Sequence, residues 1–295
     1  MKKKRLLINV RLKPEEKIKY ETLSNNIKET MNLFDNDFNL IQSCITGVNT
    51  TANGDKLYAS GSKYLFNFAE SKGWSTDLDL SIDYYKRLDE VYNPIKLYER
   101  LEVFNKSIRE RLQLINFAEE KQECVGMILD KIQNSQFIVF NSSLSLADKI
   151  AIDYNKRNSP NEEQLIVSFH SKTPTVITDD GRKFGQTKLK KYIIKELNEG
   201  GYKGISVGLH FNTDLIIPNI KIGIITGLDK YKQVQPSDKI TYSALNENDL
   251  FCTMLYIVCV DTIEKEGLKK YGLYNNLPEL DFDRFKERYI DFETL

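Results

Sequence analysis

Two hydrophobic patterns follow one another along the chain. In the first part, an alternating segment from Lys3 to Leu12 predicts a strand, and proline followed by two acids at Pro14–Glu16 is typical of the first turn of a helix. Residues 45–63 are rich in glycine, asparagine, threonine and serine and predict a loop, whereas residues 100–132 predict one long helix. We therefore expect residues 1–120 to be mainly helical, with one short strand.

In the second part, short apolar runs alternate with amphipathic helical segments at 144–157 and 187–201. This alternation is typical of a parallel sheet assembled from βαβ units. The apolar runs that we expect to form strands are 136–140, 164–171, 203–209, 220–226 and 253–260. We expect an α/β domain over residues 121–275 and a C-terminal tail over residues 276–295.

Composition narrows the classes of function. The 42 basic and 42 acidic side chains cancel, so affinity for nucleic acid must come from local patches of charge. No stretch approaches the roughly 18 consecutive apolar residues that a membrane-spanning helix needs, and the start of the chain turns polar too soon for a signal peptide. We expect a cytoplasmic protein without membrane contact.

Cysteine and histidine usage points away from metal or triad chemistry. The four cysteines form no CxxC pair, and Cys252 and Cys259 lie in an apolar run that predicts a buried strand. Structural thiols in a reducing compartment are the favoured interpretation. His170 and His210 are the only histidines, which leaves little material for a zinc site or a serine-type triad. We expect no metal site.

Four segments, taken together, carry a resemblance to a known family. Phe137–Ser143 is an apolar strand followed by small polar residues, and His170–Lys172 is a His-Ser-Lys at a strand's end. Ser206–Asn219 places threonine, aspartate and proline after a strand, and Leu255–Glu264 is a strand followed by Thr-x-Glu. Their order resembles the second motor lobe of superfamily 2 helicases, closest to the phage repair-helicase and chromatin-remodeller branches. The resemblance implies a RecA-like α/β fold, a mainly parallel sheet flanked by helices.

The resemblance also implies where ligands would bind. Nucleic acid would lie across strand ends and the loops after them, at Ser142, Ser143, His170, Ser171, Lys172, Gly208, His210, Asn212 and Thr213. The nucleotide cleft would be lined by Asp214, Gln233 and Lys239.

Plainer interpretations stand beside several of these assignments. Ser142 and Ser143 suit helix caps better than phosphate ligands, and His170 could be a hydrogen-bonded histidine at a strand's end. His210 could line the cleft between lobes or pack within its loop. A charged helix face is usually only solvated, which is the favoured interpretation of Lys188, Lys190, Lys191 and Lys195. Two interpretations are open for Arg100, Arg109 and Arg111: they could contact phosphates of nucleic acid, or they could pair with glutamates on the same helix.

Several parts of an ATP-driven motor are missing from the sequence. There is no G-x-x-x-x-G-K-[ST] phosphate loop and no strand ending in Asp-Glu, so ATP and magnesium would be held only through a partner lobe. In the segment resembling motif V, the family's glycine falls on Asp214 and its aspartate on Ile216. No arginine occurs between Arg182 and Arg284, and an arginine finger is worth about 10³–10⁵ in rate. We do not expect the chain to be an active motor alone.

Three hypotheses follow. The first is a motor module that binds DNA or RNA weakly and without sequence preference and docks on a separate ATPase lobe or another protein subunit. The second is a helicase-derived binding or structural protein that has lost catalysis; the lysine, asparagine, isoleucine and tyrosine bias would suit an AT-rich phage genome and a bacterial host cytoplasm. The third, an unrelated α/β enzyme, has little support, because no paired carboxylates or activated nucleophile stand out.

Overall fold

The chain folds into two compact units. The structure, a computed structural model, describes residues 2–46, 62–74, 94–132, 134–159, 163–173, 176–177, 183–208, 220–227, 251–271 and 277–287. The first unit comprises residues 1–16 together with 114–295, and the second comprises residues 17–113. Helices α1 (Pro14–Leu33) and α5 (Pro94–Asn116) each contribute residues to both.

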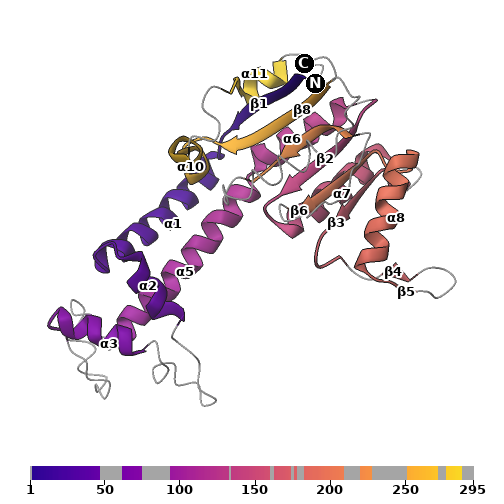
Figure 1. The fold of residues 1–295 in the computed structure, drawn as a ribbon. Coiled ribbons are helices and arrows are strands. Elements are labelled where there is room, and N and C mark those ends of the chain that lie inside the picture. The colour runs from indigo at the N-terminus through magenta and orange to yellow at the C-terminus, as the bar shows by residue number, and fades with distance from the viewer. Residues whose placement is uncertain are drawn as a thin grey trace. The chain divides into compact units, whose positions relative to one another are not determined.

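The first unit is organised around a seven-stranded sheet in the order β3-β6-β2-β7-β8-β1-β9. Every neighbouring pair is parallel, and Figure 1 shows the strands side by side. The strands are β1 (Lys2–Val10), β2 (Gln136–Asn141), β3 (Ile166–Phe169), β6 (Gly204–Gly208), β7 (Ile220–Ile225), β8 (Phe251–Cys259) and β9 (Glu279–Asp281). The expected α/β fold is confirmed, and each predicted apolar run overlaps one of these strands. A separate antiparallel pair joins β4 (Val176–Ile177) to β5 (Lys183–Phe184).

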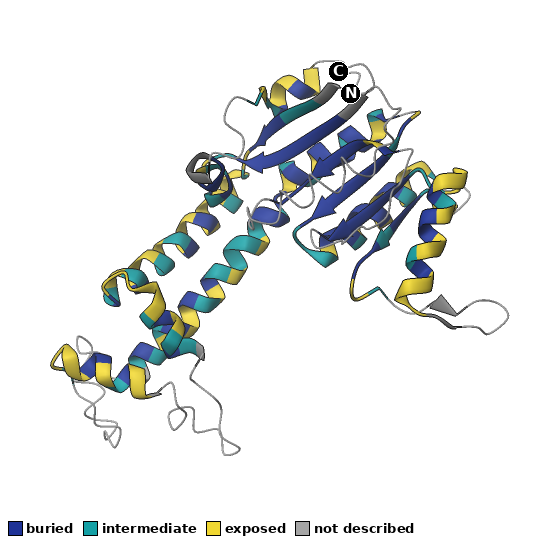
Figure 2. Ribbon diagram, viewed as in Figure 1, coloured by how far each residue is buried: buried dark blue, intermediate teal, exposed yellow. Residues whose placement is uncertain are grey.

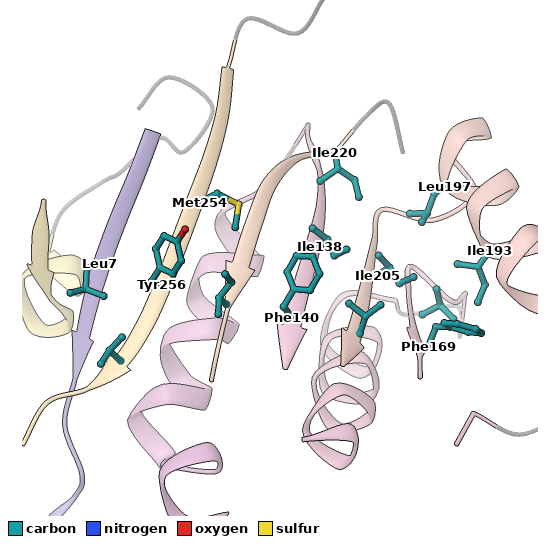
Figure 3. Packing of buried hydrophobic residues seen from close by; sticks show 14 of the residues in the cluster. Leu7, Ile138, Phe140, Phe169, Ile193, Leu197, Ile205, Ile220, Met254 and Tyr256 are labelled. Carbon is teal, nitrogen blue, oxygen red and sulfur yellow. The ribbon is translucent and has the colours of Figure 1, made fainter. Parts of the chain in front are cut away.

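Helices pack against both faces of the sheet. On one face, Tyr154 of α7 (Leu144–Asn158) packs on Phe137, with ring centroids 5.8 Å apart, and α7 contacts α6 (Glu119–Lys131). On the other face, Ile193 and Leu197 of α8 (Gln186–Glu199) join a cluster that includes Ile138 (Figure 3). Successive side chains of a strand point to opposite faces, which is why Phe137 and Ile138 meet different helices. Helices α10 (Ile263–Tyr271) and α11 (Phe282–Glu287) contact β8 and β9, respectively.

Burial on both faces accounts for the apolar runs seen in the sequence. The four residues from Phe137 to Phe140 in β2 are at most 2% exposed, and the central strands of the sheet are largely dark blue in Figure 2. A parallel strand that is covered on both sides needs apolar residues at every position, so it shows no alternation.

The second unit has a helical core of its own. It contains α2 (Phe38–Thr46), α3 (Ser62–Ser71) and most of α1 and α5. Phe34 stacks on Phe68 with ring centroids 4.8 Å apart, and Leu97, Leu101 and Phe104 present one stripe of α5 to the same cluster. The expected helical character of this region is confirmed. None of the helices in the described segments has the length and apolar character needed to cross a bilayer.

Candidate functional site

The connections of the sheet reverse direction between β2 and β7. The chain leaves β2 through α7 toward β3, whereas it leaves β7 toward β8, on the opposite side of the sheet. In open parallel sheets, such a reversal leaves a crevice outside the carboxyl ends of the two strands, where ligands bind. Asn141 and Ser142 stand at this end of β2, and Thr226 and Gly227 directly follow β7.

A buried polar network fixes the strand ends at this edge. The Asn141 side chain donates from Nδ2 to Ser206 Oγ at 3.0 Å and to the Val207 carbonyl at 3.2 Å, and its Oδ1 accepts from Thr226 Oγ1 at 2.8 Å. Asn141, Ser206 and Thr226 are all 0% exposed. Because the three side chains bond one another, they hold β6, β2 and β7 in register and do not reach a ligand themselves.

Ser142 and Gly227 approach closely across the reversal. The Ser142 hydroxyl donates to Asn116 Oδ1 at 2.6 Å, which turns it toward the end of α5. A Cβ atom on Gly227 would lie only 2.5 Å from the Ser142 Cβ and would also overlap its Oγ. Position 227 therefore has no room for a side chain.

Ser143 is the N-terminal cap residue of α7 but makes no side-chain capping bond. Its hydroxyl lies 2.8 Å from that of Ser145 instead. Of the two serines predicted to cap this helix, Ser143 is the cap residue, whereas the predicted capping bond is not formed. No acid occupies the first turn of α7 either, so its partly positive N-terminal end has neither a side-chain cap nor a carboxylate in that turn.

The residues after β3 form a tight turn organised by His170. The Thr173 N–H donates to the His170 carbonyl at 3.0 Å, and the His170 N–H donates to Thr173 Oγ1 at 2.8 Å. The Lys172 N–H donates to His170 Nδ1 at 3.1 Å, which makes Nδ1 an acceptor and leaves the ring proton on Nε2. That Nε2–H then donates to Asp148 Oδ1 at 2.9 Å.

The His-Ser-Lys segment has one buried residue, followed by two that are exposed to solvent. His170 is 8% exposed, whereas Ser171 and Lys172 are exposed. The histidine therefore positions the turn, and the serine and lysine are the side chains that a ligand would meet.

Asp148 of α7 links this turn to the sheet. Its Oδ1 accepts from Ser168 Oγ at 2.5 Å as well as from His170 Nε2. Both donors share one carboxylate oxygen, so serine and histidine are not arranged as a nucleophile and its base. Sequence reasoning missed Asp148, although a lone acid among the apolar residues of α7's inner face was a usable signal.

The described members of the predicted site lie at one edge of the sheet. Ser142 and Ser143 follow β2, the His170 turn follows β3, and Gly208 ends β6, which lies between those two strands. A Cβ on Gly208 would lie 3.0 Å from a methyl carbon of Leu144, so the Leu144 side chain packs close to the Gly208 backbone. The remaining predicted residues lie outside the described segments: His210, Asn212, Thr213, Asp214, Gln233 and Lys239.

Among the residues that the structure describes, this edge offers hydroxyls, backbone N–H groups and the exposed ammonium group of Lys172, which are groups that can hold phosphate oxygens. Within the described residues, histidine, cysteine and acidic side chains form no group of three or more that could hold a metal ion.

Comparisons with known proteins yield structural similarities only. No protein-family model and no curated protein sequence matches the chain. Among solved structures, S. cerevisiae Dbp5 bound to RNA and ADP BeF3 is similar over 57% of this chain and 40% of its own, with a TM-score of 0.44 and 11% identity. The chain thus spans less than half the length of that protein.

Two other similar structures cover different shares. The DUF1998 helicase MrfA bound to DNA and AMPPNP is similar over 55% of this chain and 20% of its own, with a TM-score of 0.38 and 15% identity. The C-terminal part of the Fun30 ATPase domain is similar over 90% of this chain and 87% of its own, with a TM-score of 0.45 and 12% identity. Similarities of this degree concern the fold alone and say nothing about activity.

Proposed function

We propose that the α/β unit is a helicase-like second motor lobe that contributes nucleic-acid contacts to ATP-dependent unwinding or translocation of DNA. One observation carries this proposal. The segments that the family pattern assigns to nucleic acid, at Ser142–Ser143, His170–Lys172 and Gly208, end three adjacent parallel strands at one edge of the sheet. A strand of nucleic acid laid along that edge would meet all of them.

The proposed contacts are to the phosphate backbone. Exposed Ser171 and Lys172, with the backbone N–H groups at the strand ends, suit phosphate oxygens and carry no information about base sequence. Because the whole chain is neutral, binding should be weak, insensitive to sequence and strongly dependent on salt. His170 acts by holding the Lys172 turn in place.

The motor would be completed by a separate lobe that binds ATP and magnesium. Asp214, Gln233 and Lys239 are proposed to line this chain's side of the shared cleft. Because the sequence has no phosphate loop, the partner would supply the phosphate and magnesium contacts.

A second candidate is a catalytically inactive, helicase-derived binding protein, with a phage as one origin. The lack of any arginine between Arg182 and Arg284 favours it, because lysine cannot reproduce the bidentate fork of an arginine finger. An adjacent open reading frame that encodes a phosphate loop, and whose product hydrolyses ATP faster when mixed with this chain, would decide for the motor module.

The nucleic-acid contact can be tested with a matched pair of lysine variants. Lys172→Ala should weaken binding to every oligonucleotide tested and should reduce the slope of log affinity against log salt by about 1. Lys221→Ala removes another exposed lysine, near the amino end of β7 at the opposite edge of the sheet, and should leave binding unchanged. If the wild-type chain retains neither single- nor double-stranded nucleic acid in filter binding at low salt, the proposal fails.

A further inference from the structure

Helix α8 has a basic outer face that the sheet does not need. Leu189, Ile193 and Leu197 recur at every fourth residue and belong to the core cluster of the sheet, where Figure 3 shows Ile193 and Leu197. On the other side, positions i, i+3, i+4 and i+7 fall on one stripe of an α-helix. In α8 this stripe consists of Lys188, Lys191, Tyr192 and Lys195, all exposed, and the outer side of α8 is yellow in Figure 2. We call these four residues the α8 stripe.

The order of charges along α8 is unfavourable for the helix dipole. A helix gains from acids in its first turn and cations in its last, because of its dipole. Helix α8 has no acid in its first turn and no base in its last, where Glu196 and Glu199 lie instead. Helix α6 has the favourable order, with two glutamates in its first turn and Lys131 in its last. Helix stability therefore does not account for the lysines.

Neighbouring acids do not account for them either. Lys195 lies 3.8 Å from Glu199, but the two side chains are 65% and 59% exposed, so the attraction is weak in solvent. Within the described segments, Lys188 and Lys191 form no ion pair. The stripe thus presents positive charge to solvent.

A hydrogen bond joins the stripe to the candidate site. Gln186, the first residue of α8, donates from Nε2 to the carbonyl oxygen of Ser171. This bond holds the first turn of α8 against the turn that presents Lys172. The exposed ammonium groups therefore continue from the carboxyl edge of the sheet along the outside of the helix.

We propose that the α8 stripe is a second contact for the phosphate backbone of the strand bound at the carboxyl edge, extending its path along the helix. The inference rests on the proposed function. From Lys188 to Lys195 the helix rises about 10 Å, which is the length of about three nucleotides of one strand of a duplex. Tyr192, 44% exposed between the lysines, offers a ring on which an unpaired base can stack. An acidic protein surface would use the charges but not the ring, so single-stranded nucleic acid is the better fit.

Oligonucleotide length separates the stripe from the strand ends. We would measure fluorescence anisotropy of labelled single strands of about 6 and about 20 nucleotides, because the short strand can fill only one of the two contacts. The double variant Lys191→Ala/Lys195→Ala should weaken binding of the long strand about tenfold near physiological salt and lower its salt slope by about 1.4, with little change for the short strand. Tyr192→Ala should weaken the long single strand more than a duplex of equal length, and Tyr192→Phe should restore it.

The control places the same substitutions on another helix. Lys149→Ala/Lys156→Ala removes two exposed lysines of α7 and should leave binding of both strands unchanged. Retention of the wild-type melting temperature by every variant would show that each has folded.

The outcomes distinguish this inference from the proposed function. If Lys172→Ala weakens binding and Lys191→Ala/Lys195→Ala leaves the long strand unaffected, the stripe is excluded and the proposed function stands. If Lys191→Ala/Lys195→Ala weakens binding of the long and the short strand equally, the stripe does not extend the path of the bound strand. The same conclusion follows if polyglutamate competes for binding as well as an oligonucleotide of equal charge. If the wild type binds neither strand at low salt, both the proposed function and the proposed role of the stripe are wrong.

Discussion

Lys121 and Glu264 form an ion pair in the interior of the α/β unit, with Lys121 Nζ 2.8 and 2.9 Å from the two carboxylate oxygens. The two side chains are 1% and 0% exposed. Glu264 Oε2 also accepts from the Cys259 N–H at 2.9 Å, and Thr262 Oγ1 donates to the Cys259 carbonyl at 2.8 Å. One carboxylate therefore ties α6 to the end of β8 and the start of α10. The Thr-x-Glu of the family pattern has, in this chain, a structural role.

Removing the lysine alone should be costly. Lys121→Met leaves the Glu264 carboxylate buried without its cation and should lower the free energy of unfolding by about 3–5 kcal/mol in urea titrations. The double variant Lys121→Met/Glu264→Gln removes both charges and keeps an oxygen for the Cys259 N–H, so it should recover most of the loss. Lys195→Met removes an exposed pair and should cost at most about 0.5 kcal/mol. A Lys121→Met variant as stable as Lys195→Met would contradict the buried pair.

The close approach of Gly227 to Ser142 leads to a prediction about coupling. Gly227→Ala should destabilise the unit by about 1–3 kcal/mol, because the added methyl overlaps the serine side chain. In a Ser142→Gly background the overlap is relieved and the cost should fall by at least half. Thermal or urea unfolding of the four proteins measures the coupling, and an equal cost in both backgrounds would mean that the contact is not the cause.

Six of the seven strands that the structure describes in this sheet could be predicted from sequence, but neither the place of β1 nor the existence of β9, which lies in the segment expected to be a tail, could be. The alternation in β1 indicated a strand near the N-terminus, and the structure pairs Lys2–Val10 with Phe251–Cys259. Register between segments so far apart is a tertiary property that local periodicity does not contain. The single helix expected over 100–132 was wrong for a similar reason. Helix α5 ends at Asn116, and a new helix begins at Glu119. The Glu119 N–H donates to Glu16 Oε1 at 3.0 Å, and Glu16 lies far away in the sequence.

Cysteine reactivity should follow burial. Burial raises the pKa of the Cys259 thiol to about 12 and that of Cys44 to about 11, and it also raises the pKa of Cys124 well above its ordinary range. Deprotonation in the folded state is thereby suppressed, and at pH 8 a thiol with a pKa near 12 is thiolate in only about one molecule in ten thousand. Iodoacetamide followed by peptide mass mapping should label these three cysteines at least about a hundredfold more slowly in the native protein than in urea. Equal labelling of Cys259 in both states would argue against its burial.

The candidate site was predictable where it is local in sequence. His170, Ser171 and Lys172 stand together, and their residue types drew attention to them. Asp148, Ser168 and Gln186 act on that turn only because α7 packs over β3 and α8 starts beside it. Such partners follow from strand order and helix packing, which no short motif encodes.

The last prediction separates positioning by His170 from charge contact by Lys172. His170→Ala removes the acceptor of the Lys172 N–H and the donor to Asp148, so the turn should lose its fixed shape while keeping its cation. Affinity for nucleic acid should fall about threefold to tenfold with an unchanged salt slope, since the number of phosphate contacts available to lysines is the same. Lys172→Ala should instead reduce the slope, because it removes a phosphate contact.

The matched control is His170→Asn, because an amide oxygen can accept from the Lys172 N–H and an amide N–H can donate toward Asp148. This variant should retain more affinity than His170→Ala in the same anisotropy titrations across a range of salt concentrations. Asp148→Ala should resemble His170→Ala, because it removes the carboxylate that orients the ring. A salt slope that falls in His170→Ala as far as in Lys172→Ala would mean that the histidine itself meets phosphate, and the positioning role would then be wrong.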